Sequence, residues 1–326
     1  MLCIVSSNTN PYYNLASEEY LLKCLKKEIF FLYRNVPSIV VGKHQNTLAE
    51  INLPFVQERN IPVARRISGG GTVFHDLGNL NFAFFTNGNE GDLVNYRRAT
   101  QPVIDAMGKM GLNVNLGKRN ELLIKGLKIS GTASHVFKQR VLHHGTLLFS
   151  SEMGDLSKAL LTGENRFTDR AVKSVRSRVT NIKDHLKESM DVEEFQKRLF
   201  EHIRLSIPNT KEYKFSTEER ERIMDLRDTK FSTWEWNFGY SPRYEFNKSL
   251  PFGDGHINLG MNVEKGIIRE LKFGGEFIAG KNIYILEEKL KGSIHDPESL
   301  RLRLAGIEVN NYIQDLDNEV LLSLMF

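Results

Sequence analysis

The sequence has little cysteine, and this shortage removes two classes of protein from consideration. Only two of the 326 residues are cysteines, and neither Cys3 nor Cys24 has the spacing of a metal or redox motif. We therefore expect a protein of the reducing cytoplasm rather than a disulfide-linked secreted domain. The amino-terminal MLCIV has no basic residues before it, which does not fit a secretory signal.

Long apolar runs and a strong net charge are missing as well. No apolar run approaches the roughly 18 residues of a membrane span. The formal net charge of +4 is too small by itself to indicate a nucleic-acid partner. There are no internal repeats and no low-complexity segment, and the length predicts one or two globular domains.

One stretch, RRISGGGTVFHDLGN from Arg65 to Asn79, holds three consecutive glycines between two arginines and a His-Asp pair. The segments IPVA before it and LNFAFF after it predict buried strands. Glycines let a backbone approach a ligand closely because no Cβ intervenes. The dinucleotide and P-loop motifs need a helix after their glycines, so neither fits. A tight hairpin with solvated arginines is the alternative, but three glycines exceed what a turn needs, and a ligand-binding loop is favoured.

Periodicity predicts a mixture of helices and strands around this stretch. Apolar spacing and capping patterns predict helices over residues 14–27, 50–59, 94–111 and 191–207, and another starting at Ser216. Strands are predicted at 29–35 and 38–46, and a β-rich block at 118–150.

Within the β-rich block, one lysine stands out. Lys125-Gly126 predicts a two-residue hairpin turn between ELLI and LKIS. Because successive side chains of a strand point to opposite faces, Lys128 and Ser130 of LKIS share one face and the apolar Leu127 and Ile129 share the other. A lysine buried on the inner face of a strand must meet an anion, so Lys128 marks a candidate anion site.

A basic segment, Arg166–Lys183, carries six basic residues and one acidic residue. Its periodicity is poor, which predicts a loop. Charge alone supports two readings equally: a solvated basic surface, or a flap that meets phosphate or an acidic partner.

From about Pro242 the pattern changes. Three short strands are predicted in RYEFNKSL, HINLGMNV and GIIRELKF, with a hairpin turn at residues 264–266. Helices are predicted at about 282–291, 297–304 and 311–324. We therefore expect a first domain over residues 1–241 and a smaller α+β domain over residues 242–326.

Three motifs in order closely resemble those of lipoate–protein ligases: RRISGGGTVFHDLGN, then LKISGTAS followed by HHGTLL, then SVRSRVTNI. The resemblance begins at NLASEE and runs through WEWNFG. It implies an α/β (mixed α+β) catalytic domain similar to those of biotin and lipoate ligases, which are related more distantly to class II aminoacyl-tRNA synthetases. The smaller domain then corresponds to an α+β accessory domain.

The reaction that this resemblance implies has two steps. The carboxylate of lipoate attacks the α-phosphate of ATP, giving lipoyl-AMP and pyrophosphate. A lysine of an acceptor protein then attacks the mixed anhydride. Mg²⁺ is expected with ATP. The acceptors implied are lipoyl domains of 2-oxoacid dehydrogenase E2 subunits or the glycine cleavage H protein, with no nucleic-acid or membrane partner.

The resemblance also implies roles for individual residues. Lys128 is expected to touch both the lipoyl carboxylate and the α-phosphate, and to stabilise charge as the phosphoryl group transfers. The basic segment resembles the family's adenylate-binding loop and is expected to shield the intermediate from water. Residues implied for ATP and adenylate are Arg66, Gly71, Thr72, Val73, Phe74, Asn79, Asn120, Glu121, Lys128, Arg176, Arg178 and Lys183. Those implied for lipoate are Ser68, Gly69, Gly70, Gly71, His75, Lys128 and His135.

Some polar residues depart from the family pattern or have structural readings. Glu121 stands where the family usually has aspartate, and His135 where some ligases have an arginine near the lipoyl carboxylate. The adjacent His143-His144 pair faces opposite sides of a strand, so structural roles are expected rather than a two-histidine metal face. His75 and Asp76 are expected to fix the loop by hydrogen bonds rather than to act as acid and base.

Two other functions fit parts of the pattern. A transferase could take preformed lipoyl-AMP or an acyl group from another protein, without ATP activation. Its thiol-dependent form needs a cysteine at the site, and both cysteines lie outside the three motifs. A non-catalytic binding protein on the same scaffold is opposed by the presence of Arg66, Gly69–Gly71 and Lys128. Lipoate-dependent ATP–pyrophosphate exchange separates the ligase from both.

Overall fold

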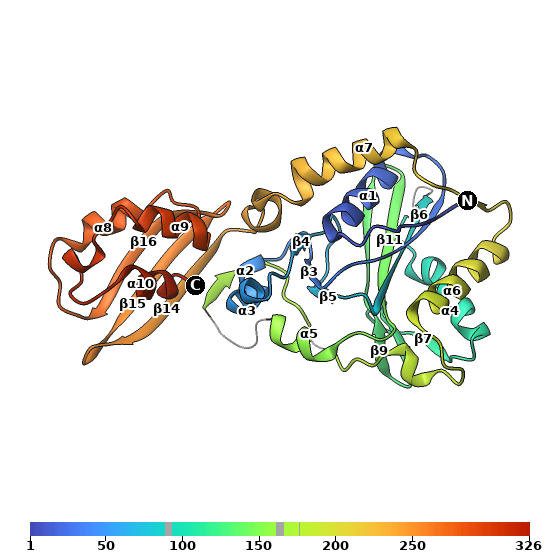
Figure 1. Cartoon of the computed structure of the whole chain (residues 1–326), viewed down its shortest axis with the longest axis horizontal. Helices are drawn as coiled ribbons and strands as arrows, with labels where there is room; N and C mark the ends of the chain where they lie inside the picture. Colours follow the sequence, from blue (N-terminus) through green and yellow to red (C-terminus); the bar gives the residue numbers. More distant parts are fainter. Residues whose placement is uncertain (89–92, 161–165, 176) are drawn as a thin grey trace. The chain divides into compact units, whose positions relative to one another are not determined.

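The computed structural model describes residues 1–88, 93–160, 166–175 and 177–326. The chain divides into two compact units, each assembled from separate stretches of sequence (Figure 1). Unit 1 comprises Met1–Lys43, Arg59–Ala159 and Ser174–Thr233, and unit 2 comprises His44–Glu58, Leu160–Lys173 and Trp234–Phe326. The internal segments 44–58 and 160–173, which fall within the first predicted domain, thus belong to unit 2.

Unit 1 is built on a six-stranded sheet. Its strand order is β10 (Thr132–Phe137), β11 (Arg140–Leu148), β6 (Asn79–Asn87), β2 (Ile29–Arg34), β1 (Leu2–Val5) and β13 (Lys211–Glu212). The pairs β10–β11, β11–β6 and β6–β2 are antiparallel. The phenylalanine-rich strands β2 and β6 lie in the middle of the sheet, and nearly all of their side chains are buried. Because both faces of these strands are covered, their apolar residues form runs instead of alternating with polar ones.

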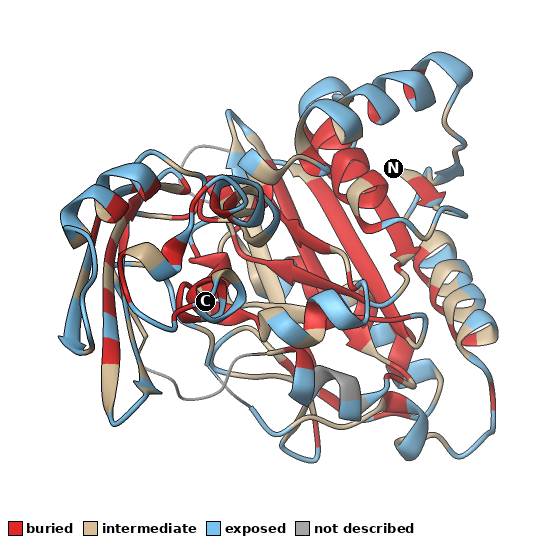
Figure 2. Cartoon of the chain, turned by 60° about the vertical axis from the view of Figure 1, so that its left-hand side comes forward, coloured by how far each residue is buried: buried red, intermediate tan, exposed pale blue. Residues whose placement is uncertain are grey.

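Helices α1 (Pro11–Cys24), α4 (Tyr96–Lys109) and α6 (Val192–Ser206) pack against this sheet, and α4 and α6 leave their polar faces in solvent (Figure 2). Helix α1 is almost entirely buried, and α7 (Thr217–Leu226) packs on it. Unit 1 also contains α5 (Met153–Ala159). The core between the sheet and α4 and α6 includes Phe82, Met107 and Phe195, all at most 1% exposed. The predicted capping box at Ser216 is confirmed at the start of α7.

Two small sheets complete unit 1 and carry the motifs singled out in the sequence. One has the order β4 (Val63–Arg65), β3 (Ser38–Val41) and β5 (Val73–His75); the other has β7 (Val114–Leu116), β8 (Leu122–Ile124) and β9 (Leu127–Ser130). The predicted hairpin turn between β8 and β9 is confirmed, because Lys125 and Gly126 both have positive φ angles, of 51° and 79°.

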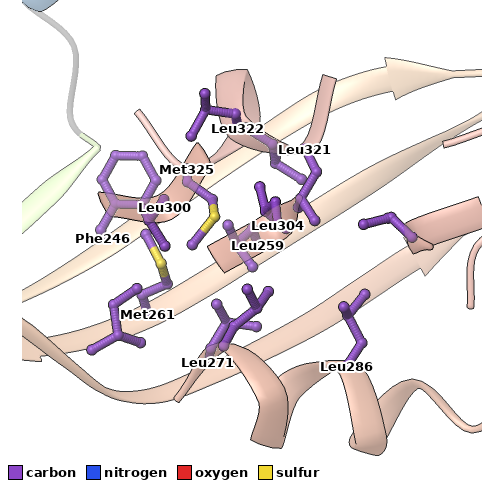
Figure 3. Packing of buried hydrophobic residues seen from close by; sticks show 14 of the residues in the cluster. Phe246, Leu259, Met261, Leu271, Leu286, Leu300, Leu304, Leu321, Leu322 and Met325 are labelled. Atoms are coloured by element: carbon purple, nitrogen blue, oxygen red, sulfur yellow. The ribbon is translucent and has the colours of Figure 1, made fainter. Parts of the chain in front are cut away.

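Unit 2 has a four-stranded antiparallel sheet in the order β12 (Phe167–Asp169), β14 (Tyr244–Phe252), β15 (Gly255–Glu264) and β16 (Ile267–Glu276). Its helices are α2 (Thr47–Glu50), α3 (Leu53–Glu58), α8 (Ile283–Leu290), α9 (Pro297–Leu304) and α10 (Asn318–Leu324). Alternating apolar residues of the sheet, such as Leu259 and Met261, pack against Leu300 and Leu321 of the helices (Figure 3). The predicted turn at 264–266 is confirmed, with positive φ at Lys265 and Gly266.

One helix prediction is corrected and another is confirmed. The helix predicted over 311–324 is a 3₁₀ turn at Val309–Asn311 followed by α10. Asp315 adopts a left-handed φ of 63°, and Asp317 caps α10 by accepting the amide of Val320, so the chain breaks before the helix begins. The helix predicted over 50–59 is confirmed as the shorter α3, and the unpredicted helix α2 precedes it. No helix within the described ranges has the length and apolar character needed to cross a membrane.

Candidate functional site

The glycine stretch forms the loop between β4 and β5, folded back against β3. The amide of Lys43 donates to the carbonyl of Ser68 at 2.8 Å. Gly70 has a φ of 92°, a conformation that side chains oppose. A Cβ added to Gly42 would lie 2.1 Å from the Gly70 carbonyl oxygen, so both glycines are needed for this close approach. The sequence predicted one loop between the strands at 61–64 and 80–85, and this is corrected: the unpredicted strand β5 lies inside the stretch and pairs with β3, so the glycines occupy the shorter loop between β4 and β5.

Arg66 holds the loop from inside. Its side chain is 6% exposed, and its guanidinium donates to the carbonyl oxygens of Val40, Gly69 and Gly71 at 2.7–3.2 Å. Nε also donates to the hydroxyl of Ser68 at 3.1 Å. Burial lowers the pKa of Arg66 to about 10, against an opposing effect of the Glu18 carboxylate. The implied nucleotide contact of Arg66 stays a prediction, since its donors serve the loop in this structure.

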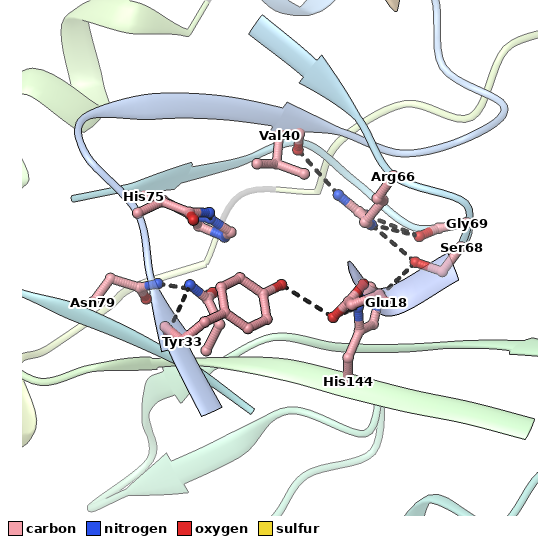
Figure 4. Close-up of polar contacts among 11 residues, drawn as sticks. Glu18, Tyr33, Val40, Arg66, Ser68, Gly69, His75, Asn79 and His144 are labelled. Atoms are coloured by element: carbon pink, nitrogen blue, oxygen red, sulfur yellow. Dashed lines mark hydrogen bonds and ion pairs between the residues drawn. The ribbon is translucent and has the colours of Figure 1, made fainter. Parts of the chain in front are cut away.

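A buried chain of hydrogen bonds ties Ser68 to two distant elements (Figure 4). The Ser68 hydroxyl lies 2.6 Å from Nε2 of His144 on β11. The other ring nitrogen of His144 lies 2.9 Å from both carboxylate oxygens of Glu18 on α1. The hydroxyl of Tyr33 donates to Glu18 at 3.0 Å. Ser, His and Glu in this order resemble a hydrolytic triad, but Ser68 is 0% exposed, so the chain positions the loop rather than attacking a substrate.

His75 and Asn79 close the far end of the stretch. Nδ1 of His75 accepts from the side-chain amide of Asn35 at 2.9 Å, which leaves the proton on Nε2, a buried atom with no partner. Asn79 donates to Asn81, and its own Oδ1 is likewise buried and unpartnered. One donor and one acceptor are thus left for a ligand or for water. Asp76 accepts the amides of Gly78 and Glu152 and fixes the turn.

We predict that His75 makes the protein less stable at acid pH. Burial, then the charges of Arg66 and His144, lower the pKa of His75 to about 3. Because this lies below the unfolded value of about 6.5, the unfolded chain binds more protons, and stability falls as the pH drops below about 6.5. Each pH unit in that window costs about 1.4 kcal/mol. Urea unfolding at several pH values gives the unfolding free energy as a function of pH. Between about pH 3 and 6.5 this free energy should change less steeply with pH in His75→Gln than in the wild type, and as steeply as the wild type in exposed His44→Gln. The same pH dependence in all three proteins would contradict the assignment of this effect to His75.

Lys128 lies at the middle of β9, and the basic segment runs beside it. Its amide donates to the carbonyl of Arg178, and its carbonyl accepts the amide of Thr180, both at 3.0 Å. The side chain is half-buried, and a Cβ on Gly131 would lie 3.4 Å from its Nζ. Desolvation lowers its pKa, Glu121 opposes this, and Arg119 and Arg66 add to it. A partly desolvated ammonium group beside other cations is suited to receive an anion.

The basic segment also contacts the glycine stretch. The amide of Thr72 donates to the Ser174 hydroxyl at 2.9 Å. Ser174, in the middle of the segment, is therefore bonded to Thr72, and residues 178 and 180 are bonded to Lys128, so the segment contacts both elements that the sequence singled out. Its described residues are irregular except for β12 and a 3₁₀ turn at Ile182–His185, as predicted for a loop. Arg178 and Lys183 have exposed side chains, and Arg176 lies outside the described residues.

We predict that Gly71→Ala impairs the site much more than Gly69→Ala. A Cβ at Gly71 would lie 3.1 Å from Oγ and 3.3 Å from Cα of Ser174, so the basic segment must move away. A Cβ at Gly69 meets no protein atom within 4 Å, so Gly69→Ala changes the same loop without displacing Ser174, and the rates of both variants are compared at saturating lipoate. Displacing the segment should lower the rate of adenylate formation about tenfold or more. The comparison is made by single-turnover kinetics, and equal rates for both variants would show that the position of Ser174 is irrelevant.

The remaining predicted residues lie near Lys128, on β10 and on β5. Asn120 has a φ of 63°, and its carbonyl accepts from the hydroxyl of Thr132. Glu121 accepts the amide of Arg119 at 2.7 Å. His135 is half-buried on the edge strand β10, and burial followed by the charge of Lys43 lowers its pKa. Val73 and Phe74 belong to β5, where Phe74 is buried.

Sequence reasoning missed the side chains that support the loop from outside the glycine stretch. These are Glu18, Tyr33, Asn35, His144 and Ser174. Glu18 and His144 stood inside recognised motifs, but nothing local indicated that they touch. The structural roles expected for His143 and His144 stay a prediction, which their hydrogen bonds support. Nε2 of His143 accepts the amide of Asn95, and the two rings face different neighbours.

Comparison with known families matches both parts of the chain. Residues 10–204 match the model of the lipoyl protein ligase A/B catalytic domain, and residues 241–325 match that of the bacterial lipoate protein ligase C-terminus. Lipoate–protein ligase 1 of Staphylococcus aureus is 38% identical over 325 residues, which cover 98% of this chain and 99% of the relative.

Two solved structures are similar over 73% of the chain. Lipoate-protein ligase A bound with ATP has a TM-score of 0.63 at 27% identity, with 98% of that chain covered. The bipartite lipoate protein ligase of Thermoplasma acidophilum, studied with its E2 lipoyl domain, has a TM-score of 0.64 at 26% identity, with 96% of that chain covered. The predicted mixed α/β ligase fold is confirmed.

Proposed function

Because the chain belongs to the lipoyl protein ligase A/B family, we propose that it activates lipoate with ATP and transfers the lipoyl group to a lysine of an acceptor protein. The observation that carries this proposal is the basic segment joining two elements: the glycine stretch held by Arg66, and β9 with the half-buried Lys128. The reaction must bring the lipoate carboxylate and the α-phosphate of ATP together away from water. The glycine stretch allows a close approach of the substrate, Lys128 supplies a partly desolvated positive charge, and the basic segment would cover the site.

In the first step, a carboxylate oxygen of lipoate bonds to the α-phosphorus and pyrophosphate leaves. We assign to Lys128 the neutralisation of charge on both anions during this transfer. In the second step, the acceptor lysine nitrogen bonds to the acyl carbon, AMP leaves, and the nitrogen loses a proton. The contacts of residues 174 and 178–180 hold the basic segment across the site, where it would keep water from the mixed anhydride.

We propose that the lipoyl group lies along Ser68–Gly71, with His75 and His135 as its polar neighbours. The unpartnered Nε2 proton of His75 supports a hydrogen-bond role there. At the nucleotide end we place the residues from Gly71 to Phe74, together with Asn79, Asn120 and Glu121. Arg66 would act there by fixing the carbonyls of the loop, and Arg178 and Lys183 would turn from solvent toward the phosphates.

We propose residues 1–241 as the catalytic domain and 242–326 as the accessory domain. Mg²⁺ would enter with the phosphates of ATP, because the described residues contain no group of three His, Cys, Asp or Glu side chains placed to hold a metal ion. The cytoplasm is the proposed location, supported by two free cysteines, of which Cys3 is buried.

The proposed acceptors are lipoyl domains of 2-oxoacid dehydrogenase E2 subunits or the glycine cleavage H protein. The archaeal relative studied with its E2 lipoyl domain supports the first. Incubation with each purified apo-acceptor, followed by intact mass measurement, tests both.

ATP–pyrophosphate exchange tests the activity itself. We expect exchange that depends on lipoate, with octanoate and biotin run in parallel as competing acids. Folded protein that shows no exchange but transfers lipoyl groups from added lipoyl-AMP would support the transferase alternative. Folded protein that does neither would contradict an enzymatic function.

A further inference from the structure

The carboxyl-terminal end of the basic segment is held by a side chain that the proposed site does not include. Asn181 directly precedes the 3₁₀ turn at Ile182–His185. Its Oδ1 accepts the amide of Ser151 at 2.9 Å, and its Nδ2 donates to the carbonyl of Ser151 at 3.1 Å. One asparagine therefore pairs with both main-chain polar groups of a single residue, which fixes its own position in two directions.

Ser151 lies in residues 149–152, the connecting stretch between β11 and α5, and the glycine stretch holds this connection. The carbonyl of Gly78 accepts the first two amides of the connecting stretch, at 3.1 and 3.0 Å. The two carboxylate oxygens of Asp76 accept the amides of Gly78 and Glu152, at 2.9 and 2.8 Å. The end of the basic segment and the end of the glycine stretch thus meet on the same four residues.

Packing fixes the chain immediately after Asn181. Ile182 is 0% exposed and belongs, with Phe149, to the core of unit 1. The amide of Lys183 donates to the carbonyl of Phe149 at 3.0 Å. Because these contacts do not use the Asn181 side chain, a substitution of Asn181 should leave the fold intact. The two bonds of Asn181 instead set the direction of the chain that leads to Thr180, whose amide pairs with β9.

We propose that Asn181 is a positioning residue that holds the basic segment over the site, so that the adenylate passes to the acceptor lysine instead of reacting with water. Asn181 acts through the main chain of residues 178–180 and does not itself touch a substrate. Asp76 contributes indirectly, because it fixes the connecting stretch to which Asn181 is bonded. This inference rests on the proposed ligase activity and assigns the residues that keep its intermediate covered.

The competing reaction defines the measurement. When water reaches the adenylate, its oxygen bonds to the acyl carbon, AMP leaves, and lipoate is released again. Transfer to the acceptor releases one AMP for each lipoyl group attached, whereas hydrolysis releases AMP with no attachment. The ratio of AMP formed to lipoyl groups attached therefore reports how well the intermediate is covered.

Asn181→Ala should raise the AMP formed in excess of transfer about tenfold. Each of the two lost bonds favours the attached segment by roughly fivefold. The ratio is measured with purified apo-acceptor, ATP and lipoate, from the AMP released and the mass of the acceptor. A variant that had partly unfolded would lose AMP formation and transfer together, so its ratio would stay that of the wild type.

Ser151→Ala is the matched control. Asn181 bonds only to main-chain atoms of Ser151, and the buried Oγ of Ser151 has no partner among the described residues. Alanine at this position keeps both bonds, so the ratio should equal that of the wild type.

Asp76→Asn tests the connecting stretch from its other side. Asparagine has one acceptor oxygen where Asp76 uses two, so the amide of Gly78 or of Glu152 loses its partner. This variant should raise the same ratio as Asn181→Ala does. The double variant should exceed the stronger single variant only slightly, because both act through residues 149–152.

Limited trypsin digestion gives a measurement that is independent of activity. Arg178 and Lys183 are exposed cleavage positions near Asn181. Cleavage there should be about tenfold faster in Asn181→Ala than in the wild type or in Ser151→Ala. Cleavage after Lys118, an exposed residue outside the segment, should be unchanged.

The outcomes separate this inference from the proposed function. Wild-type protein that forms neither pyrophosphate nor AMP would overturn the proposed function, and the role of Asn181 would fall with it. An active wild type whose ratio is unchanged by Asn181→Ala would overturn the role of Asn181 alone, whatever the digestion shows. A ratio raised equally in Ser151→Ala would do the same.

Discussion

Lys128→Ala is expected to lower lipoate-dependent ATP–pyrophosphate exchange by about 10²–10³-fold, the effect of removing one preorganised charge-stabilising donor. The lysine ammonium is half-buried, its pKa is lowered first by desolvation, and Arg119 and Arg66 add positive potential around it. The lipoate carboxylate and the α-phosphate of ATP would make direct ionic contacts with the Lys128 ammonium and so replace the hydration that it loses on burial. Alanine removes this interaction for both substrates, so transfer to the acceptor should fall together with exchange.

The fold of the Lys128→Ala protein should be unchanged. The hydrogen bonds of residue 128 to Arg178 and Thr180 use main-chain atoms, which alanine retains. Lys118→Ala is the control, because Lys118 is an exposed lysine close in sequence. Thermal unfolding is followed alongside exchange in all three proteins. Full acceptor lipoylation by Lys128→Ala would remove the central residue of the proposed mechanism.

Arg66→Lys is expected to destabilise the protein by roughly 2–4 kcal/mol and to lower exchange about a hundredfold. The guanidinium donates to four different oxygens around the glycine stretch, in directions set by its planar fork. Lysine keeps the charge but has three donors on one atom, so several buried carbonyl oxygens would lose their partners. The loss of these contacts should release the loop between β4 and β5.

Arg222→Lys is the matched control for Arg66→Lys. Arg222 lies on α7 with 61% of its side chain exposed and pairs with Glu218, so this change should stay within about 0.5 kcal/mol. Urea unfolding and exchange are measured on both variants. If Arg66→Lys is as stable as the wild type but has lost exchange, the main role of Arg66 is to bind the nucleotide and not to hold the loop between β4 and β5.

Local patterns were enough to predict most elements of the fold. Buried strands appear as continuous apolar runs in β2 and β6, and hairpin turns appear as residues that tolerate positive φ, such as Gly126 and Gly266. The exception at the carboxyl end has a local cause. The apolar spacing over 311–324 suits a helix, but Asp315 in a left-handed conformation and the cap at Asp317 begin the helix later.

The sequence by itself determined the family, through three ordered motifs, and it predicted the glycine stretch and Lys128 as the centre of the proposed site. Only the tertiary structure decided what supports them. Ser68 and His144 are 76 residues apart, and His144 and Glu18 are 126 apart, yet they form one buried chain of hydrogen bonds. Periodicity reports whether a residue is buried, whereas its polar partner depends on which strands and helices the topology brings together. For the same reason, the sequence could not show that Arg66 is engaged by the carbonyls of its own loop, or that Asn181 is bonded to the main chain of Ser151.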